Sequence, residues 1–275
     1  MCMRALPLSD AFATGEDLAD PRAPASAAGP RPTIALYDLN RPTGGPVATY
    51  RGHADMVSAL AAAPGEAKVL ASGGGDGCVR LWDCRLAPER ACVASFAGGP
   101  GGGRAHVELV SGLDVSGPLL ASCSMDKTMC VWDIRGAVAA AAAASAAGGA
   151  GAGARPPLAR HNLDGTDVLK VALRPGSGYG PPARPAAALL TMSAAYVLDL
   201  SGAVEVAPGG AGAAAGPAAA GGGGGATVVR AQLFADVAEA VAAEQGGPYQ
   251  DVRWLPGAQA IVCAGNTGRL DVMAT

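Results

Sequence analysis

The stretch LASGGGDGCVRLWDCR, residues 70–85, returns almost unchanged as LASCSMDKTMCVWDIR, residues 120–135. The two copies align without a gap, each residue of the second lying 50 positions after its counterpart. The aligned pairs with distinctive chemistry are Ser72 and Ser122, Asp76 and Asp126, and Trp82 and Trp132. A phrase that recurs at a fixed period of this size predicts a repeat architecture.

Short strand-like runs surround both copies. MVSALAAAP, KVLASGG, CVRLWDC and ACVASFAG follow one another between residues 56 and 98, each bounded by turn-forming residues. VELVSGLDV, PLLASCS and TMCVWDI restate the first three of these runs. Each repeat is therefore expected to be a four-stranded antiparallel unit, lengthened by the glycine-rich loop AGGPGGGRAH.

Four kinds of side chain recur at places where a tight strand unit needs them. Aspartates at the turn after the second strand can accept backbone and imidazole hydrogen bonds. A tryptophan six residues later can fill space between units, and its indole N–H needs a buried acceptor such as a serine hydroxyl. A histidine enters each unit, 29 residues before the first tryptophan and 26 before the second. These sets are His53, Ser72, Asp76 and Trp82, and His106, Ser122, Asp126 and Trp132.

This arrangement resembles the His–Ser/Thr–Asp–Trp structural tetrad of the WD40 family. The resemblance implies an all-β chain with a WD40-type β-propeller fold, and it implies a structural role for both tetrads. A Ser–His–Asp hydrolase is the competing interpretation, but the set occurs twice and no Gly-x-Ser-x-Gly elbow accompanies it. We therefore expect no catalytic residues and no enzyme activity.

The remaining sequence predicts weaker units. TIALYDLN and PVATYRG predict a hairpin, with Tyr37 in the tryptophan position, and a degraded blade with Tyr196 for tryptophan follows later. We therefore expect about four blades, two of them degraded. Propellers close with about four to eight blades, and a WD40 ring usually has more blades than this chain supplies. The expected propeller is therefore incomplete. An open end would expose strand edges and invite association.

The predicted segments follow from composition. They are a disordered leader (1–31), well-formed blades (32–136), an Ala/Gly-rich linker (137–160), a degraded blade (161–202), a second Gly/Ala-rich linker (203–226) and a partial blade (227–275). Within the last segment, residues 233–241 predict either a short helix or a strand and a loop.

Several classes of function are disfavoured by composition. A net charge of -3 gives no basic field for direct nucleic-acid binding, and no long apolar segment or secretory signal predicts a membrane association. Seven cysteines without a Cys-x-x-Cys pair predict neither a disulfide framework nor a metal site. No phosphate-binding motif is present, so we expect no cofactor and no small-molecule substrate.

Some motifs are similar to one WD40 subfamily, the Polycomb scaffolds of the Extra sex combs type. These are VRLWDCR with VASFAGGPGGGRAHVELVSGLDV, SCSMDKTMCVW and YQDVRWLPG, and the likeness covers residues 34–135 and 249–265. The resemblance implies a noncatalytic nuclear scaffold that holds a histone H3 methyltransferase subunit. The aromatic cage with which that family reads trimethyl-lysine has no counterpart in the matched residues, so no cage position is assigned.

A second class of function rests on two arginines. WDCR and WDIR place Arg85 and Arg135 two positions after Asp83 and Asp133, which resembles the WDxR box of substrate receptors for cullin–RING ubiquitin ligases. In those receptors the arginine meets the adaptor. The competing interpretation is a solvated ion pair with the neighbouring aspartate. A generic WD40 adaptor of another complex is the third possibility.

Overall fold

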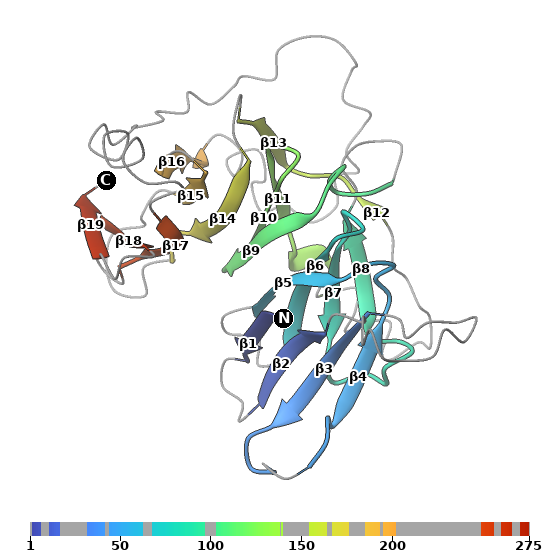
Figure 1. Ribbon diagram of the computed structural model, residues 1–275. Helices are drawn as coiled ribbons and strands as arrows, with labels where there is room; N and C mark the ends of the chain where they lie inside the picture. Colours follow the sequence, from blue (N-terminus) through green and yellow to red (C-terminus); the bar gives the residue numbers. More distant parts are fainter. Residues whose placement is uncertain are drawn as a thin grey trace, which may run out of the picture.

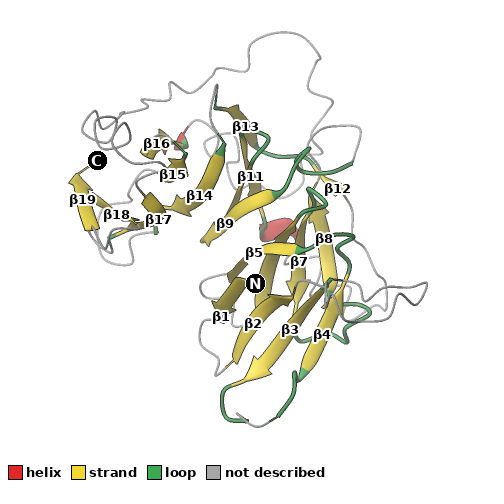
Figure 2. Ribbon diagram, viewed as in Figure 1, coloured by secondary structure: helices red, strands yellow, loops and turns green. Residues whose placement is uncertain are grey.

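The computed structural model describes residues 2–6, 11–16, 32–41, 44–62, 68–96, 103–137, 139, 154–163, 167–175, 185–192, 195–201, 249–255, 260–265 and 270–274. These residues form a nearly all-β molecule with five sheets, which follow one another in chain order around an arc (Figures 1 and 2). Each sheet is called a blade below.

The first three blades have at least four strands. Blade 1 contains β1 (Cys2–Ala5), β2 (Ala11–Glu16), β3 (Thr33–Asp38) and β4 (Ala48–Arg51). Blade 2 contains β5 (Val57–Ala62), β6 (Val69–Gly74), β7 (Val79–Asp83) and β8 (Cys92–Phe96), with β12 (Ala154–Arg155) parallel to β8. Blade 3 contains β9 (Val110–Ser116), β10 (Leu119–Ser124), β11 (Thr128–Asp133) and β13 (Ala159–Asn162).

The last two blades have three described strands each. Blade 4 contains β14 (Val168–Leu173), β15 (Ala186–Thr191) and β16 (Ala195–Asp199). Blade 5 contains β17 (Tyr249–Trp254), β18 (Ala260–Gly265) and β19 (Leu270–Ala274). The fold is therefore an incomplete β-propeller, and the strands expected from the sequence around both repeats are confirmed.

The first strand of each blade lies innermost. It packs beside the first strand of the next blade from β1 through β5, β9 and β14 to β17. These strands surround a cavity of about 280 Å³, to which every blade contributes at least one residue. Representative lining residues are Met3, Leu60, Leu113, Val171 and Arg253. All five blades therefore turn about one axis.

The apolar core lies between successive blades. Each blade has two faces because side chains alternate along a strand, and both faces of an inner blade are covered. In blade 2, Trp82 packs toward blade 1, where its ring lies 5.9 Å from that of Tyr50. Leu81, the next residue along the strand, packs toward blade 3. Continuous hydrophobic strands such as VLASGG and LLASCS follow from this two-sided burial.

Three expectations need correction. The leader was expected to be disordered, but β1 and β2 pair with each other and β2 pairs with β3, so residues 2–5 and 11–16 belong to blade 1. The linker 137–160 contains β12 and the first residues of β13. The described residues form five sheets, where about four blades were expected. In each case a strand finds its partner far along the chain, which local composition does not reveal.

The register of blade 4 corrects another expectation. In blade 2 the pair of β6 and β7 residues farthest from the turn is Val69 and Asp83, and the next pair toward the turn is Leu70 and Trp82. In blade 4 the corresponding pair is Ala187 and Leu198, so Leu198 rather than Tyr196 occupies the tryptophan position.

Two other expectations lie outside the described residues, namely the helix or strand over 233–241 and the linker 203–226. Within the part of the chain that is described, no helix is long and apolar enough to cross a membrane.

Candidate functional site

The histidine-centred set of blade 2 forms one buried chain of hydrogen bonds. His53, on the loop that enters β5, contacts Asp76 in the turn after β6, with 3.0 Å between Nδ1 and Oδ1. Its Nε2 lies 2.7 Å from Ser72 Oγ on β6. Trp82 on β7 donates its indole N–H to the same Ser72 oxygen at 2.7 Å. The set therefore ties the entry loop to both central strands of the blade.

The chemistry of the partners fixes the protons in this chain. An ionised Asp76 only accepts, so His53 Nδ1 carries the proton of that contact. The indole of Trp82 only donates, which leaves the Ser72 hydroxyl proton for His53 Nε2. Each of these donors then has an acceptor within the set.

Asp76 is held in its charged form. Burial by itself would raise the pKa of its carboxyl group, but the hydrogen bonds from His53 and from the backbone N–H of Ala54 outweigh burial and lower the pKa to about 2. The Cys78 backbone N–H also donates to this carboxylate, at 3.1 Å. The aspartate thereby closes the turn between β6 and β7.

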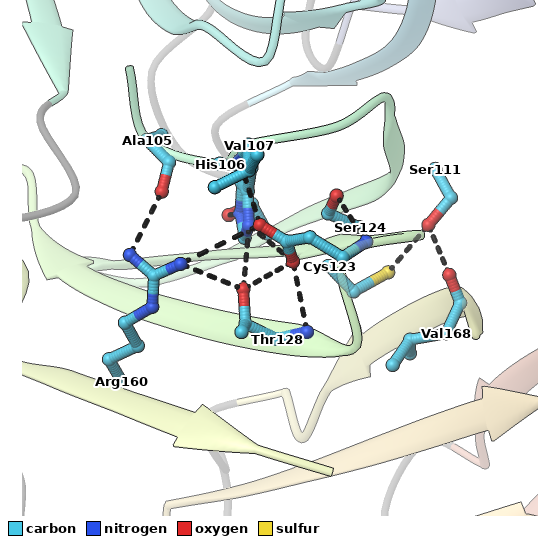
Figure 3. Close-up of polar contacts among 11 residues, drawn as sticks. Ala105, His106, Val107, Ser111, Cys123, Ser124, Thr128, Arg160 and Val168 are labelled. Atoms are coloured by element: carbon cyan, nitrogen blue, oxygen red, sulfur yellow. Dashed lines mark hydrogen bonds and ion pairs between the residues drawn. The ribbon is translucent and has the colours of Figure 1, made fainter. Parts of the chain in front are cut away.

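The corresponding set of blade 3 includes a residue that the sequence comparison did not single out (Figure 3). His106 Nε2 lies 2.6 Å from Ser122 Oγ, and its Nδ1 lies 2.9 Å from Thr128 Oγ1 and 3.3 Å from Asp126 Oδ1. Thr128 donates its hydroxyl to Asp126 at 2.5 Å. Thr128 lies two residues after the turn aspartate, at the position where blade 2 has Cys78. The signal that could have identified Thr128 is the replacement of this cysteine by a hydroxyl-bearing residue in the second repeat.

A basic side chain reinforces this second set. Arg160 reaches in from the outer strand β13 and lies 3.6 Å from Asp126 Oδ2 (Figure 3). Burial would raise the pKa of Asp126, but hydrogen bonds from His106 and Thr128 and from the Val107 backbone N–H outweigh burial and hold the pKa well below its usual range. Blade 3 therefore anchors its outer strand through the turn aspartate.

One expected hydrogen bond is missing. The indole nitrogen of Trp132 was expected to donate to Ser122, but it is buried without a hydrogen-bond partner among the described residues. The ring instead packs against Phe96, 5.3 Å between centroids, and edge-on to His106 at 6.5 Å. Blade 3 thus keeps the shape of the set of blade 2 but not its complete hydrogen bonding.

The two sets are linked through a glycine. Gly77 follows Asp76 in the turn, has a φ of 70°, and accepts a 2.9 Å hydrogen bond from the His106 backbone N–H. A Cβ atom at this position would lie 2.3 Å from the His106 carbonyl oxygen. Only glycine combines this backbone conformation with this close approach, so the turn of blade 2 positions the histidine of blade 3.

The geometry of these sets does not resemble a working nucleophile. The side chains of His53 and Ser72 are buried, and the Ser72 oxygen already accepts from Trp82. A serine nucleophile needs an exposed oxygen beside an oxyanion hole. No group of described His, Cys, Asp or Glu residues could hold a metal ion either.

Arg85 and Arg135 occupy equivalent positions in blades 2 and 3. Arg85 donates from Nε and Nη2 to the two carboxylate oxygens of Asp83, at 2.8 and 2.6 Å. Arg135 makes the same two-point contact with Asp133, from Nε to Oδ1 at 3.1 Å and from Nη2 to Oδ2 at 2.5 Å. Their side chains are 50% and 58% exposed. Each guanidinium is therefore held in one orientation while half of it faces solvent.

The aspartates that hold these arginines belong to a wider pattern. In four blades the residue at this strand end is an aspartate whose Oδ1 accepts the backbone N–H of the residue two positions later. The four pairs are Asp38 and Asn40, Asp83 and Arg85, Asp133 and Arg135, and Asp199 and Ser201. The aspartate is thus a turn residue, and only blades 2 and 3 place an arginine on it.

Successive blades are also joined by hydrogen bonds that the repeat pattern did not reveal. Ser58 in β5 donates to the Val110 carbonyl of blade 3 at 2.6 Å, and Ser111 in β9 donates to the Val168 carbonyl of blade 4. Cys2 in β1 makes the weaker equivalent contact with the Val57 carbonyl, 3.4 Å from its sulfur. The repeated Val-Ser dipeptide, residues 57–58 and 110–111, is the signal that could have indicated this bond.

Blades of antiparallel strands around a channel, two of them with a buried His–Ser–Asp–Trp set, define a β-propeller, a fold typical of protein-interaction modules. Residues 44–83 and 100–133 match the family model described as WD domain, G-beta repeat, and these two stretches are WD40 repeats. Over 69 residues the chain is 35% identical to the F-box/WD repeat-containing protein sel-10 of Caenorhabditis elegans. That similarity covers 25% of this chain and 11% of the relative, so it spans about a tenth of the relative's length.

Proposed function

We propose that this chain is a noncatalytic scaffold that acts as a substrate receptor for a cullin–RING ubiquitin ligase, with Arg85 and Arg135 as the residues that meet the adaptor. WD40 repeats are protein-interaction modules, and the F-box/WD repeat-containing relative supports this assignment. The observation that carries the proposal is the equal geometry of the two exposed, carboxylate-held guanidinium groups in adjacent blades.

The two arginines lie on the same end of the propeller. Both follow the third strand of a blade, whereas His53 and His106 precede the first strand and lie at the opposite end, because antiparallel strands alternate in direction. One partner surface can therefore contact both arginines without reaching the buried sets. Preorganised arginines are favourable interface residues because little side-chain entropy is lost on binding.

The contribution of these ion pairs to stability is expected to be small. The guanidinium ends are half exposed, and exposed ion pairs stabilise proteins by about 0–1 kcal/mol. The Asp83 carboxylate is buried, but it keeps the hydrogen bond from the Arg85 backbone N–H when the Arg85 side chain is removed. Folding stability by itself therefore gives little preference for an arginine at either position. A binding role accounts for the arginines, while the turn role accounts for the aspartates.

The test is co-purification of a cullin adaptor with tagged full-length chain. The double variant Arg85→Ala and Arg135→Ala is expected to lose the adaptor while its thermal midpoint stays close to that of the unmodified chain. Arg51→Ala is the matched control, since Arg51 is an exposed arginine at the end of β4, on the opposite end of the propeller. Unchanged recovery of the adaptor by the double variant would overturn the proposal.

We propose as the second candidate a nuclear Polycomb-type scaffold that holds a histone methyltransferase subunit. Its support is the turn that follows β10, where Met125 is exposed directly beside the buried Asp126 set and where the sequence is similar to that subfamily. Affinity purification should then recover a SET-domain subunit, and Met125→Glu should reduce the yield. Recovery of no such subunit would remove this candidate.

A further inference from the structure

A β-bulge near the start of the first strand recurs in blades 2 to 5. In each of these strands one residue is skipped in the pairing with the second strand, and the residue after it lines the central cavity. The four lining residues at this position are Ala59, Gly112, Lys170 and Asp251. A bulge re-aims the side chain beside it, so these four positions define one level of the cavity.

The side chains at this level form two kinds of wall. Blades 2 and 3 contribute only a methyl group at Ala59 and a hydrogen atom at Gly112, which leaves space. Blades 4 and 5 contribute a charged wall, which consists of Lys170, Asp251 and Arg253. The two strands that carry this wall, β14 and β17, pack beside each other. The open space of the cavity therefore adjoins three charged side chains.

The charges of this wall are not balanced. Arg253 Nε lies 3.4 Å from Asp251 Oδ2, and Asp251 Oδ1 accepts the backbone N–H of Val252 at 3.0 Å. The carboxylate is thus engaged at both oxygens. The Nη groups of Arg253 and the ammonium group of Lys170 have no hydrogen bond or ion pair with another described residue. Two cationic side chains against one carboxylate leave a net charge of +1 in the cavity.

The charge of Lys170 acts across the cavity. Burial raises the pKa of the Cys2 thiol on β1, and the Lys170 ammonium group opposes that rise. Cys2 and Lys170 belong to blades 1 and 4, and both line the cavity. An anion inside the cavity therefore lies in the field of this ammonium group, in a partly enclosed site where the attraction is stronger than in bulk water.

The cavity also offers uncharged polar groups. The first strand of each blade is at the edge of its sheet and lies on the side of the cavity. Such an edge presents backbone N–H and C=O groups that pair with no further strand. A ligand with hydroxyl or amide groups can therefore form hydrogen bonds here in addition to its contact with the charged wall.

We propose that the cavity binds a small polar organic acid, whose carboxylate group contacts the Lys170 ammonium group and the Nη groups of Arg253. One carboxylate matches the net charge of +1, and a guanidinium group presents parallel donors that fit both carboxylate oxygens. The volume of about 280 Å³ equals that of about nine water molecules at ~30 Å³ each, so a small acid fits whereas a peptide of several residues does not.

The sequence carries no motif for this site because β14 and β17 lie far apart in the chain and meet only in the folded propeller. The expectation of no small-molecule substrate depended on the absence of a phosphate-binding motif, and that absence says nothing about a carboxylate.

The test is binding of sodium lactate to the full chain, measured by titration with saturation-transfer difference NMR. Lactate is expected to bind, whereas its neutral analogue lactamide is not. Lys170→Met and Arg253→Met should each weaken lactate binding by about tenfold to a hundredfold, because each removes a charge-assisted hydrogen bond. Lys68→Met is the matched control, since Lys68 is an exposed lysine directly before β6 and does not line the cavity.

Three outcomes would overturn the proposal: no binding of lactate, equal binding of lactamide, or unchanged binding by both cavity variants. A blocked peptide, acetyl-alanyl-glutamyl-alanine amide, separates a small acid from the acidic side chain of a protein partner. It should bind more weakly than lactate, and tighter binding would refute the assignment to a small acid. Circular dichroism of every variant confirms that the blades remain folded. The outcome is independent of the adaptor experiment, since neither Arg85 nor Arg135 lines the cavity.

Discussion

Replacement of Trp82 by phenylalanine should destabilise the protein more than the same replacement of Trp132. Both rings are fully buried between blades, so both variants lose similar apolar contacts and leave a similar cavity. Trp82→Phe also removes the 2.7 Å hydrogen bond to Ser72, worth about 1 kcal/mol. Trp132→Phe instead removes a buried N–H that has no described partner, which relieves a cost of about 1–3 kcal/mol. The two unfolding free energies should therefore differ by about 2–4 kcal/mol.

Urea unfolding followed by circular dichroism measures this difference as a shift of the midpoint at equal slope. Trp254→Phe is the matched control, because the Trp254 indole is buried and donates to the Ala172 carbonyl at 2.8 Å. It should behave like Trp82→Phe. Equal losses for Trp82 and Trp132, or a larger loss for Trp132, would refute the assignment of the unsatisfied indole.

Three further predictions concern the turns and the contacts between blades. The pKa of Asp76 is about 2 in the folded chain against the model-compound value of 3.8, so its stabilisation is complete above pH 3.8 and is lost as the pH falls through 2. Acid titration should remove about 2 kcal/mol in that window, and Asp76→Asn should show a shallower loss; a parallel curve would contradict it. Gly77→Ala should lower the thermal midpoint by several degrees, since about 1–3 kcal/mol of strain is expected at a positive φ, whereas Gly45→Ala, where a Cβ meets nothing within 4 Å, should not. Ser58→Ala should cost about 1 kcal/mol in urea unfolding, because it removes the bond to blade 3, and no change would show that this bond does not contribute.

The repeated segments were predictable because their structure is largely local. The short apolar runs and the turns at Asp76 and Asp126 specify hairpins, and a hairpin fixes its own register. The 50-residue period then aligned the histidine, serine, aspartate and tryptophan positions. The side chains of His53, Ser72, Asp76 and Trp82 accordingly meet in one hydrogen-bonded chain.

The degraded blades were harder to interpret because their register depends on partners. Tyr196 has the expected aromatic character, but the pairing of Ala187 with Leu198 moves the tryptophan position by two residues. Thr128 joins the second set only because the turn brings its hydroxyl between His106 and Asp126. Neither fact follows from residue types alone.

By itself, the sequence determined the class of fold, the repeat period and the residues of two buried sets, because each is encoded within one hairpin or one fixed spacing. Among the described residues, the tertiary structure decided the number of blades, the recruitment of residues 2–5, 11–16 and 159–162 as strands, and the unpaired indole of Trp132. The physical reason is that strand pairing and burial between blades join residues far apart in the chain. Both therefore depend on which distant segment packs against a strand, and the local sequence pattern does not determine that.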